Sequence, residues 1–576
     1  MHPPLSDKRR AAAARLRRRC VLVTSRSLRR TSDLLPAHRG RASRVHALIR
    51  ALGLAQRFSV HEPPLASPEE LMRFHSREYL ALLRSSDPRP HDRADEEACA
   101  CLMGDADGSD SGSDEDEEEE GEGGGDAGDG GASTLELYGL TGDCEPFPGV
   151  WQHSRAVAGA ALCAARRLVA ASNERDDARS RWRAAQKRLH AAGVACAPPE
   201  DSDEEEEEEE DSEEEEEEEE AADAEAAAAG GDEATALPHG AERPPPLPLG
   251  GPQPQPPPPR APLAVCWTGG RHHAQADKAA GFCYVNDIVL AILEILRSST
   301  DARVLYIDVD VHHGDGVAAA FASSDRVLTL SLHHHARGFF PGSGAASEVG
   351  IGRGKHHDVN VALRRGVSDA TFTALFERTT SMLERAYRPT HVVWQCGADA
   401  LAWDPQAVFN LTPMVFGALA AHVRSFDIPL LVLGGGGYHV TQTARAWAFA
   451  TAALVEGPFG DTRLDPDAEL PEHEYYAEYI SARGRSEGEL VDEDDEKAGA
   501  AGRGSVYDNA MALRGGDSAL FGSGGGGFGF MLRTRPVSSI TRPDEEAGEG
   551  RIDELMETVA AAAERIGQRR LRRGGR

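Results

Sequence analysis

The chain has 576 residues, a formal net charge of −33 and no apolar run of the roughly 18 residues that a membrane-spanning helix needs. Its nine cysteines lack paired spacing, which is typical of a protein in a reducing compartment. These features argue against a transmembrane protein and a disulfide framework, and we expect no membrane partner.

Two acidic tracts carry most of the negative charge. Residues 92–129 include 17 acidic side chains, and residues 200–233 include 23. Such runs repel themselves and bury little apolar surface, so we expect both tracts to be disordered. They would also repel nucleic acid, and we expect no direct nucleic acid binding. Basic partners such as histone tails would suit them, and a solvated spacer without a partner is an equally good interpretation.

Changes in composition predict one folded domain that is interrupted by inserts. Domain segments are expected at 20–85, at 134–170 and from 262 onward, and inserts at 86–133 (acidic, Gly-rich) and 171–261 (charged helical, acidic, Pro-rich). Basic tails are expected at 1–19 and 568–576. The basic N-terminus fits either a nuclear signal or a short transit peptide.

Helical patterns occur around 45–52 and 68–83, and from residue 262 onward short apolar strands alternate with helix-length segments. The expected strands are 263–267, 303–311, 326–332, 391–396 and 429–434. The expected helices are 284–297, 315–322, 369–387, 412–425 and 441–455. This alternation predicts an α/β fold with a mostly parallel central sheet and helices on both faces. Ligands bind such sheets beyond the carboxyl ends of the strands, where the polar motifs of this chain fall.

The stretch YIDVDVHHGDG at 306–316 is the most informative of these motifs. If the strand continues through it, Asp308, Asp310 and His312 point to the same side, because side chains alternate along a strand. Two carboxylates on a buried strand are costly without a cation or hydrogen-bond donors. Asp310 and His312 are therefore candidate ligands of a divalent metal, although an acidic strand end that caps the next helix would show the same pattern.

A third ligand is expected from Asp399, in WQCGADALAWDP at 394–405, directly after another predicted strand. An Asp–His–Asp set with open positions is typical of a catalytic site, because structural zinc prefers four closed ligands rich in Cys. Its oxygen-rich ligands fit both Zn²⁺ and Fe²⁺.

Two histidines, His272 and His273, follow a glycine pair on a predicted loop. Beside a metal, one of them would face the attacking water as a base, with Asp308 or Asp315 fixing its tautomer. Considered alone, a histidine pair is more often a surface or structural feature.

A four-glycine turn at 434–437 precedes Tyr438. Glycines permit close backbone approach, so this turn would present the phenol as a hydrogen-bond donor to a developing oxyanion, or it is an ordinary loop. Phe282 and the Phe339–Phe340 pair would wall a narrow channel, or they belong to the core. A metal, a base, an oxyanion donor and a slot together fit hydrolysis of an amide on a long side chain, such as acetyl-lysine.

These motifs occur in the order found in one family. GGRHHAQADKAAGFCYVND, YIDVDVHHGDGV, GFFPGSG, QCGADALAWDP, FNLTPM and LGGGGYHVTQTARAW resemble the zinc-dependent histone deacetylases, class I. The segments at 41–54 and 471–479 resemble the histone deacetylase 8 branch of that class. The similarity spans roughly 20–85, 134–170 and 262–480, and it implies the arginase/deacetylase-like form of the α/β fold. The segment TRPDEE…RIDELMETVAAAAERIG resembles the terminal helix of the family. The resemblance therefore implies a helix at 541–567 that docks on the domain, a third domain segment at 262–482 and a disordered insert at 483–540 between them.

The resemblance implies a role for each site residue. It implies zinc ligation by Asp310, His312 and Asp399, catalysis by His273, His272, Tyr438, Asp308 and Asp315, and substrate contacts from Asp143, Gly281, Phe282, Phe340 and Gln406. It further implies an acetate-release channel lined by Arg41, and a structural K⁺ ion held by Asp308, Asp310, His312, Ser331 and Leu332. His273, with Asp315 behind it, would be the general base and then the general acid, and Tyr438 would polarise the acetyl carbonyl.

The implied activity is removal of acetyl groups from lysine side chains of histones or other proteins, in the nucleus or also in the cytoplasm, with a role in chromatin and transcription repression. Some positions depart from the family pattern. Arg271 stands where Trp or Leu is usual, Gln406 replaces an apolar rim residue, and Gly142 replaces a Tyr near the rim. These departures leave other acyl-lysines or acetylpolyamines open as substrates. A histone-binding scaffold that uses the acidic tracts is the competing interpretation.

Overall fold

The computed structural model describes residues 19–90, 99–102, 133–191, 259–455, 464–480, 543–546 and 550–574. Its contacts divide the chain into two units, Met1–Ser172 with Ala261–Arg576, and Asn173–Arg260. Nearly all of both acidic tracts, and all of the predicted insert at 483–540, lie outside the described residues. The disorder expected there therefore stays a prediction.

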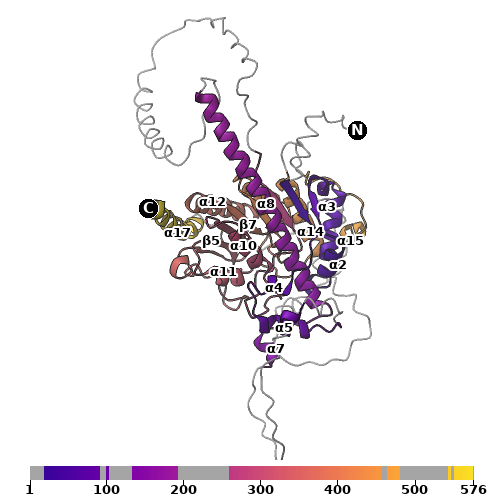
Figure 1. Ribbon diagram of the computed structural model, residues 1–576. Coiled ribbons are helices and arrows are strands. Elements are labelled where there is room, and N and C mark those ends of the chain that lie inside the picture. Colours follow the sequence, from indigo (N-terminus) through magenta and orange to yellow (C-terminus); the bar gives the residue numbers. More distant parts are fainter. Residues whose placement is uncertain are drawn as a thin grey trace, which may run out of the picture. The chain divides into compact units, whose positions relative to one another are not determined.

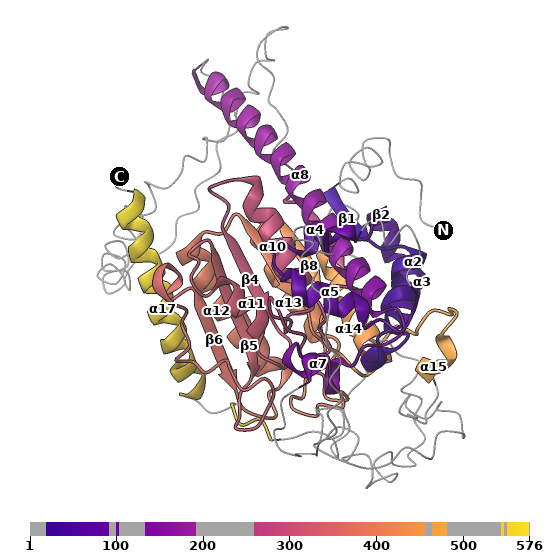
Figure 2. The same cartoon turned by 60° about the horizontal axis from the view of Figure 1, so that its bottom comes forward.

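A single eight-stranded parallel sheet forms the centre of the first unit (Figures 1 and 2). Its strand order is β2-β1-β3-β8-β7-β4-β5-β6. The strands are β1 (Cys20–Val23), β2 (Ser59–His61), β3 (Leu263–Cys266), β4 (Val304–Asp308), β5 (Val327–His334), β6 (Asp358–Leu363), β7 (His391–Gln395) and β8 (Leu430–Leu433). The predicted α/β fold with a parallel sheet is confirmed.

Helices surround this sheet. They are α2 (Arg26–Ser32), α3 (Arg41–Ala51), α4 (Pro68–Leu71), α5 (Arg77–Ser85), α7 (Thr134–Leu137), α8 (Val150–Ala191), α10 (Asp287–Ser298), α11 (Asp315–Phe321), α12 (Asp369–Tyr387), α13 (Val415–Ser425), α14 (Val440–Leu454), α15 (Tyr476–Ile480) and α17 (Arg551–Gly574). Short 3₁₀ turns are η1 (Pro36–His38), η2 (Leu54–Arg57), η3 (Ala100–Leu102), η4 (Gly142–Cys144) and η5 (Gly352–Gly354).

The side chains of the central strands alternate between two hydrophobic cores, one on each face of the sheet. In β4, Leu305 and Ile307 belong to a core that also contains residues of α3, α12, α13 and α14. Val304 and Tyr306 belong to a second core, with residues of α10, α11 and the first part of α8. Strand side chains point to opposite faces with a period of two, so both faces of the sheet are covered by helices.

The sequence missed three strands and joined two helices. β1 and β2 have only four and three residues, which is too short for a periodic signal. In β6 the alternation of Val359, Val361 and Leu363 into one core was a usable signal. The predicted helix at 68–83 is two helices, because a capping box of Ser67 and Glu70 starts α4 and a second serine cap starts α5.

Part of the first predicted insert is packed into the domain. Cys99, just before η3, and Leu102, its last residue, are both buried, in a third core with Leu80 and Trp151. Residues 92–129 therefore include a short apolar segment that packs into the domain. The acidic composition of the tract as a whole obscured this segment, although the residues next to Cys99 and Leu102 are uncharged.

The helix α17 lies against α12 (Figure 2). Its buried stripe recurs at helical spacing and consists of Leu555, Met556, Val559, Ala562, Ala563 and Ile566. The segment before it is also attached to α12, because Oδ2 of Asp544 accepts hydrogen bonds from the backbone N–H of Ser368 (3.0 Å) and the hydroxyl of Thr371 (2.7 Å) at the start of that helix.

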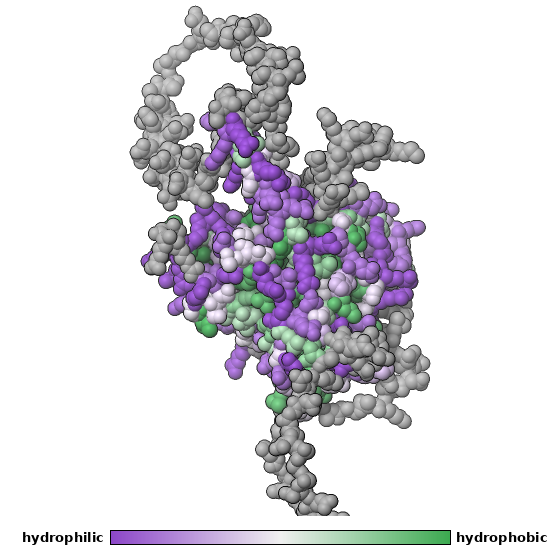
Figure 3. Space-filling view, viewed as in Figure 1, coloured by the Kyte–Doolittle hydropathy of each residue, from purple (hydrophilic) through white to green (hydrophobic). Residues whose placement is uncertain are grey.

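The described surface is mainly polar. On the face shown in Figure 3, hydrophilic side chains are interspersed with smaller hydrophobic areas. The exposed large hydrophobic side chains of the described residues are Val60, Leu65, Leu137, Ile351 and Leu571. Within the same described ranges, none of the helices has the length and apolar character needed to cross a bilayer.

Replacing Val559 by Asp should weaken the attachment of α17, because the substitution places an unpaired carboxylate in the core beside α12. We expect the free energy of unfolding to fall by about 3 kcal/mol, measured by urea denaturation. The matched control is Ala560→Asp on the exposed face of the same helix, which should change it by less than about 0.5 kcal/mol. Equal losses in both variants would contradict this packing.

Candidate metal centre and active site

Five adjacent strands, in the order β3-β8-β7-β4-β5, carry the site at their carboxyl ends. The segments that follow them contain His272 and His273 after β3, Tyr438 after β8, Asp399 after β7, Asp310 and His312 after β4, and Phe340 after β5. Because all the strands are parallel, these segments meet at the same edge of the sheet.

The chain leaves the sheet earlier than predicted. The expected strand 303–311 ends at Asp308, so Asp310 and His312 lie in the following loop. From Asp310 onward, backbone N–H groups bond to carboxylates instead of a neighbouring strand: that of Asp310 donates to Oδ1 of Asp308 (3.1 Å), and that of His312 to Oδ1 of Asp310 (3.2 Å). Strand alternation was therefore the wrong reason for expecting the three side chains together.

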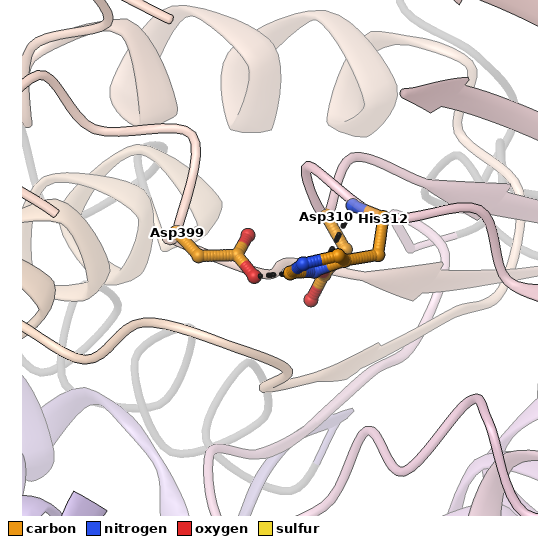
Figure 4. Close-up of side chains that lie close together, drawn as sticks. All are labelled: Asp310, His312 and Asp399. Atoms are coloured by element: carbon orange, nitrogen blue, oxygen red, sulfur yellow. Dashed lines mark hydrogen bonds and ion pairs between the residues drawn. The ribbon is translucent and has the colours of Figure 1, made fainter. Parts of the chain in front are cut away.

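Asp310, His312 and Asp399 form a compact buried cluster (Figure 4). Nδ1 of His312 lies 3.0 Å from Oδ1 of Asp310 and 3.1 Å from Oδ2 of Asp399. Among the residues that the structure describes, this is the one group of three His, Cys, Asp or Glu side chains whose ligand atoms lie within 4.8 Å of one another. Bonds of about 2.1 Å to one tetrahedral ion would place neighbouring ligand atoms about 3.4 Å apart, so the cluster fits a divalent metal.

The outer oxygens of both carboxylates are held by the protein. Oδ2 of Asp310 accepts hydrogen bonds from Nε2 of Gln395 (2.9 Å) and the backbone N–H of Gly436 (2.8 Å). Oδ1 of Asp399 accepts one from the backbone N–H of Val311 (2.9 Å). Because these donors hold one oxygen of each carboxylate, the other oxygen, Oδ1 of Asp310 and Oδ2 of Asp399, is directed at the imidazole of His312.

The charges of this cluster also call for a cation. Burial by itself raises the pKa of Asp310, but the imidazoles of His272 and His312 lower it well below its usual range. Burial and the neighbouring Asp310 raise the pKa of Asp399 to about 6. Although burial lowers the pKa of His312, its two carboxylate partners raise it to about 10. Without an ion, a proton on His312 offsets part of the charge of the two carboxylates. A divalent ion would displace that proton and neutralise both carboxylates.

The two histidines after β3 are each held by a carboxylate. Nδ1 of His272 lies 2.9 Å from Oδ2 of Asp308, and Nδ1 of His273 lies 2.7 Å from Oδ1 of Asp315. These are the pairings expected from the sequence. Because a carboxylate only accepts, each Nδ1 carries the proton and each Nε2 is turned away from its carboxylate. The hydroxyl of Tyr306 donates to the same Oδ2 of Asp308 (2.6 Å).

The two rings differ in charge although their centroids are 3.8 Å apart. Burial lowers the pKa of His272, but Asp308 and Asp310 more than compensate and raise it to about 9. Burial and the positive charge of His272 lower the pKa of His273 to about 4. One imidazolium thus stands beside one neutral imidazole, as with paired titratable groups whose environments push their pKa values apart.

The glycine turn after β8, which leads into Tyr438, is held in place by hydrogen bonds from a buried arginine. Arg41, at the start of α3, donates from Nη1 to the carbonyl of Gly437 (2.9 Å) and from Nη2 to that of Gly435 (2.8 Å). The backbone N–H of Tyr438 donates to Oδ2 of Asp404 (2.7 Å). Arg41 therefore positions this turn, and its expected place along an acetate channel stays a prediction.

The phenol of Tyr438 is close enough to the carboxylates of the Asp310–His312–Asp399 cluster to feel their charge. Burial and the carboxylates of Asp399 and Asp310 raise its pKa well above the usual value. Its ring lies 5.7 Å from that of Phe282, at an interplanar angle of 63°. The hydroxyl therefore keeps its proton and remains a hydrogen-bond donor.

Two half-buried aromatic rings stand beside the histidine pair. The ring of Phe340 lies 4.8 Å from that of His273 at an angle of 80°. A side chain at Gly281 would collide with both, because its Cβ would come within 2.6 Å of His273 and 2.9 Å of Phe340. Gly281 therefore allows His273 and Phe340 to approach the backbone closely, and Phe282 follows it at a φ of 63°.

The predicted rim residues are less closely tied to this cluster. Asp143 is half-buried in η4, and Gln406 is half-buried with its backbone N–H donating to Oδ1 of Asp404 (3.0 Å). The neighbouring Gly142 is exposed, and a Cβ built there would meet nothing within 4 Å. The rim is therefore open at this point.

Of the predicted cation residues, Asp310 and His312 belong to the cluster itself, whereas Asp308 ends β4 and Ser331 and Leu332 lie in the neighbouring strand β5. Ser331 of β5 is the register partner of Asp308 in β4, and its hydroxyl donates to Nδ1 of His333 (2.9 Å). Leu332 is buried beside it. A K⁺ ion at these residues stays a prediction.

Sequence reasoning missed three residues that position the site. Gln395 holds Asp310, Asp404 holds the backbone of Tyr438, and Asp287 accepts backbone N–H groups from Gly270 (3.0 Å) and Arg271 (2.7 Å). Each is a buried polar residue inside a motif already singled out. An Asp or Gln within an apolar segment was the available signal, because a buried polar side chain needs a hydrogen-bond partner. The sequence does not show which residue that partner is, because it lies far away in the chain.

Comparisons with known proteins agree with the motifs. A family model described as the histone deacetylase domain matches residues 35–454. The chain is 32% identical over 439 residues to histone deacetylase 8 of Xenopus tropicalis, covering 76% of this chain and 82% of that protein. Over 217 residues, or 38% of this chain, it is 45% identical to histone deacetylase 8 of Xenopus laevis (64% of that protein covered) and 47% identical to histone deacetylase RPD3 of Saccharomyces cerevisiae (48% covered).

The chain therefore belongs to the histone deacetylase family. The resemblance predicted from its motifs is confirmed, including the likeness to histone deacetylase 8 within that family. The family is one of hydrolases, which agrees with an Asp–His–Asp cluster beside a neutral imidazole and a phenol.

Replacing His312 by Ala should remove the bound divalent ion, because two carboxylates alone leave the coordination incomplete. Metal analysis after dialysis should find about one ion per wild-type chain and almost none in the variant. The matched control is His391→Ala, a buried histidine at the opposite, N-terminal end of β7, and it should keep its metal. Full metal content in the His312 variant would disprove the ligand assignment.

Proposed function

We propose that this protein is a metal-dependent lysine deacetylase that hydrolyses N-ε-acetyl-lysine in histones or other proteins and releases acetate. The observation that carries the proposal is the convergence of Asp310, His312 and Asp399 beside the pair His273–Asp315. A non-catalytic scaffold would need none of these contacts.

Asp310, His312 and Asp399 would hold the ion, and both Zn²⁺ and Fe²⁺ suit a site of two carboxylates and one imidazole. When bound, such an ion lowers the pKa of water and polarises the substrate carbonyl. Asp315 holds Nδ1–H of His273, so Nε2 is free to accept the proton of the attacking water. The phenol of Tyr438 donates to the oxyanion that develops, and His273 then returns its proton to the departing lysine amine.

His272 takes a supporting electrostatic role in this proposal. Its ring is enclosed between Asp308 and His273, with Nδ1 on the carboxylate. A fixed imidazolium there limits the negative charge that the buried carboxylates accumulate. A K⁺ ion at Asp308 and its neighbours on β5 would act in the same sense, as a structural cation.

A long, slender substrate suits the approach to the site. Gly281, Phe282 and Phe340 would wall a narrow passage in front of His273, whose ring lies 4.8 Å from that of Phe340. Such a passage would fit the methylenes of a lysine side chain. Asp143 and Gln406 would meet the substrate backbone at the rim. The acidic tracts would attract basic partners such as histone tails, and nuclear action in chromatin and transcription repression is the setting that we propose.

The open rim at Gly142 favours a second candidate, the same hydrolysis on another acyl-lysine or on an acetylpolyamine. A panel of acyl-lysine peptides and acetylpolyamines, assayed with the apoprotein reloaded separately with Zn²⁺ and Fe²⁺, tests both substrate and metal. We expect acetyl-lysine peptides to give the highest kcat/KM and a chelator to abolish turnover. Turnover that survives chelation would refute metal dependence, and a preference for polyamines would favour the second candidate.

Replacing Tyr438 by Phe should reduce kcat by about 10²–10³-fold, because it removes one oxyanion donor and leaves the ring in place. Metal content should not change. The matched control is Tyr387→Phe, a buried tyrosine on α12 whose hydroxyl bonds to the carbonyl of Asp325 (3.3 Å), and its kcat should stay near the wild-type value. Near-normal turnover in the Tyr438 variant would contradict the role assigned to this phenol.

A further inference from the structure

A glutamine in the loop after the histidine pair reaches the carboxylate that holds His273. Oδ1 of Asp315 lies 2.7 Å from Nδ1 of His273, and Oδ2 of the same carboxylate accepts a hydrogen bond from Nε2 of Gln275 (3.2 Å). Among the described residues, no other group donates to this second oxygen. The carboxylate of Asp315 thus has two hydrogen-bond partners in the described part of the chain.

The neighbouring atoms fix which end of the Gln275 amide points inward. Nε2 also donates to the backbone carbonyl of His273 (3.4 Å). Burial raises the pKa of Asp315, but the hydrogen bond from His273 and the charges of nearby imidazoles lower it below its usual value, so this carboxylate is ionised. A carbonyl oxygen and an ionised carboxylate only accept, so the NH₂ end of the amide must face them. One amide therefore connects the backbone of His273 with the carboxylate that holds its ring.

The backbone around Gln275 is itself held by hydrogen bonds. Its N–H donates to the carbonyl of Lys278 (2.8 Å) across the bend between them, and the carbonyl of Ala276 accepts from the backbone N–H of Ser76 (2.8 Å). The side chain of Gln275 is also half-buried. It therefore extends from a fixed point of the chain, unlike that of an unrestrained surface glutamine.

The other histidine–carboxylate pair shows how little supports Asp315. Asp308 is fully buried, and its carboxylate also accepts the hydroxyl of Tyr306 on Oδ2 (2.6 Å) and the backbone N–H of Asp310 on Oδ1 (3.1 Å). The side chain of Asp315 is 20% exposed, and apart from its histidine Gln275 is the one donor to it among the described residues. Rotation about the last bond of an aspartate is soft, so a single donor on Oδ2 decides where Oδ1 points.

We propose that Gln275 is a positioning residue for catalysis by His273, an inference that rests on the proposed function and adds a residue to it. By holding Oδ2 of Asp315, the amide keeps Oδ1 in line with Nδ1–H of His273. The opposite nitrogen of the ring, Nε2, then stays directed at the attacking water. Gln275 acts only through Asp315 and touches no reacting atom.

The test compares the full-length protein, loaded with Zn²⁺, with its variants Gln275→Met and Gln275→Lys. Methionine keeps the length and unbranched shape of the side chain but has no donor, whereas lysine restores a donor that can reach the carboxylate. We expect Gln275→Met to lower kcat on an acetyl-lysine peptide by about tenfold, the usual loss when a group that orients a functional side chain is removed. KM should change by less than about twofold, and Gln275→Lys should return kcat to within about threefold of the wild type.

A second measurement does not depend on turnover. The Nδ1 proton of His273, shared with a carboxylate at 2.7 Å, should give a low-field proton NMR signal, which is assigned by its absence in His273→Phe. In Gln275→Met this signal should broaden or move to higher field, because the carboxylate no longer keeps one orientation. Gln275→Lys should restore it.

The matched control is Gln568→Met on α17, which removes a similar contact, from Nε2 of Gln568 to Oε1 of Glu564 (2.8 Å). It should change neither kcat nor the imidazole signal, and the metal content of all the Gln variants should equal that of the wild type. Unchanged kcat and an unchanged signal in Gln275→Met would overturn the proposal. A loss of kcat that Gln275→Lys does not restore would overturn it as well.

The two proposals can fail separately. If the wild type does not hydrolyse acetyl-lysine peptides, the proposed function fails, and the imidazole signal still decides whether Gln275 positions the pair. If the wild type is active and Gln275→Met matches it in both measurements, only the role of Gln275 fails.

Discussion

The site is organised around two buried carboxylates, Asp310 and Asp399, at the ends of the adjacent strands β4 and β7. Ionised carboxylates are tolerated in a protein interior only when cations and donors surround them. The loop after β4 therefore turns its N–H groups toward carboxylates, and His312 enters between the two side chains. Local chain path and ligand geometry thus have one electrostatic cause.

Glycines make this close approach possible. A Cβ at Gly397 would lie 2.3 Å from Oδ2 of Asp310, and one at Gly436 would lie 2.3 Å from Oδ2 of Asp399. Side chains there would force the carboxylates apart or block the N–H of Gly436 from donating. The glycine-rich strand ends are therefore part of the coordination geometry, and they also explain how Arg41 reaches two backbone carbonyls of the same turn.

The sequence by itself determined the α/β class, the five central strands and the identities of the ligand and catalytic candidates, because hydrophobic periodicity and motif order are local properties. Only the tertiary structure decided that β4 stops at Asp308, that β1 and β2 extend the sheet, and that Gln395, Asp404 and Asp287 hold the site. These features depend on strand pairing and on hydrogen bonds between residues that are separated in the chain. A pattern read along the sequence carries no record of which distant donor reaches which buried acceptor.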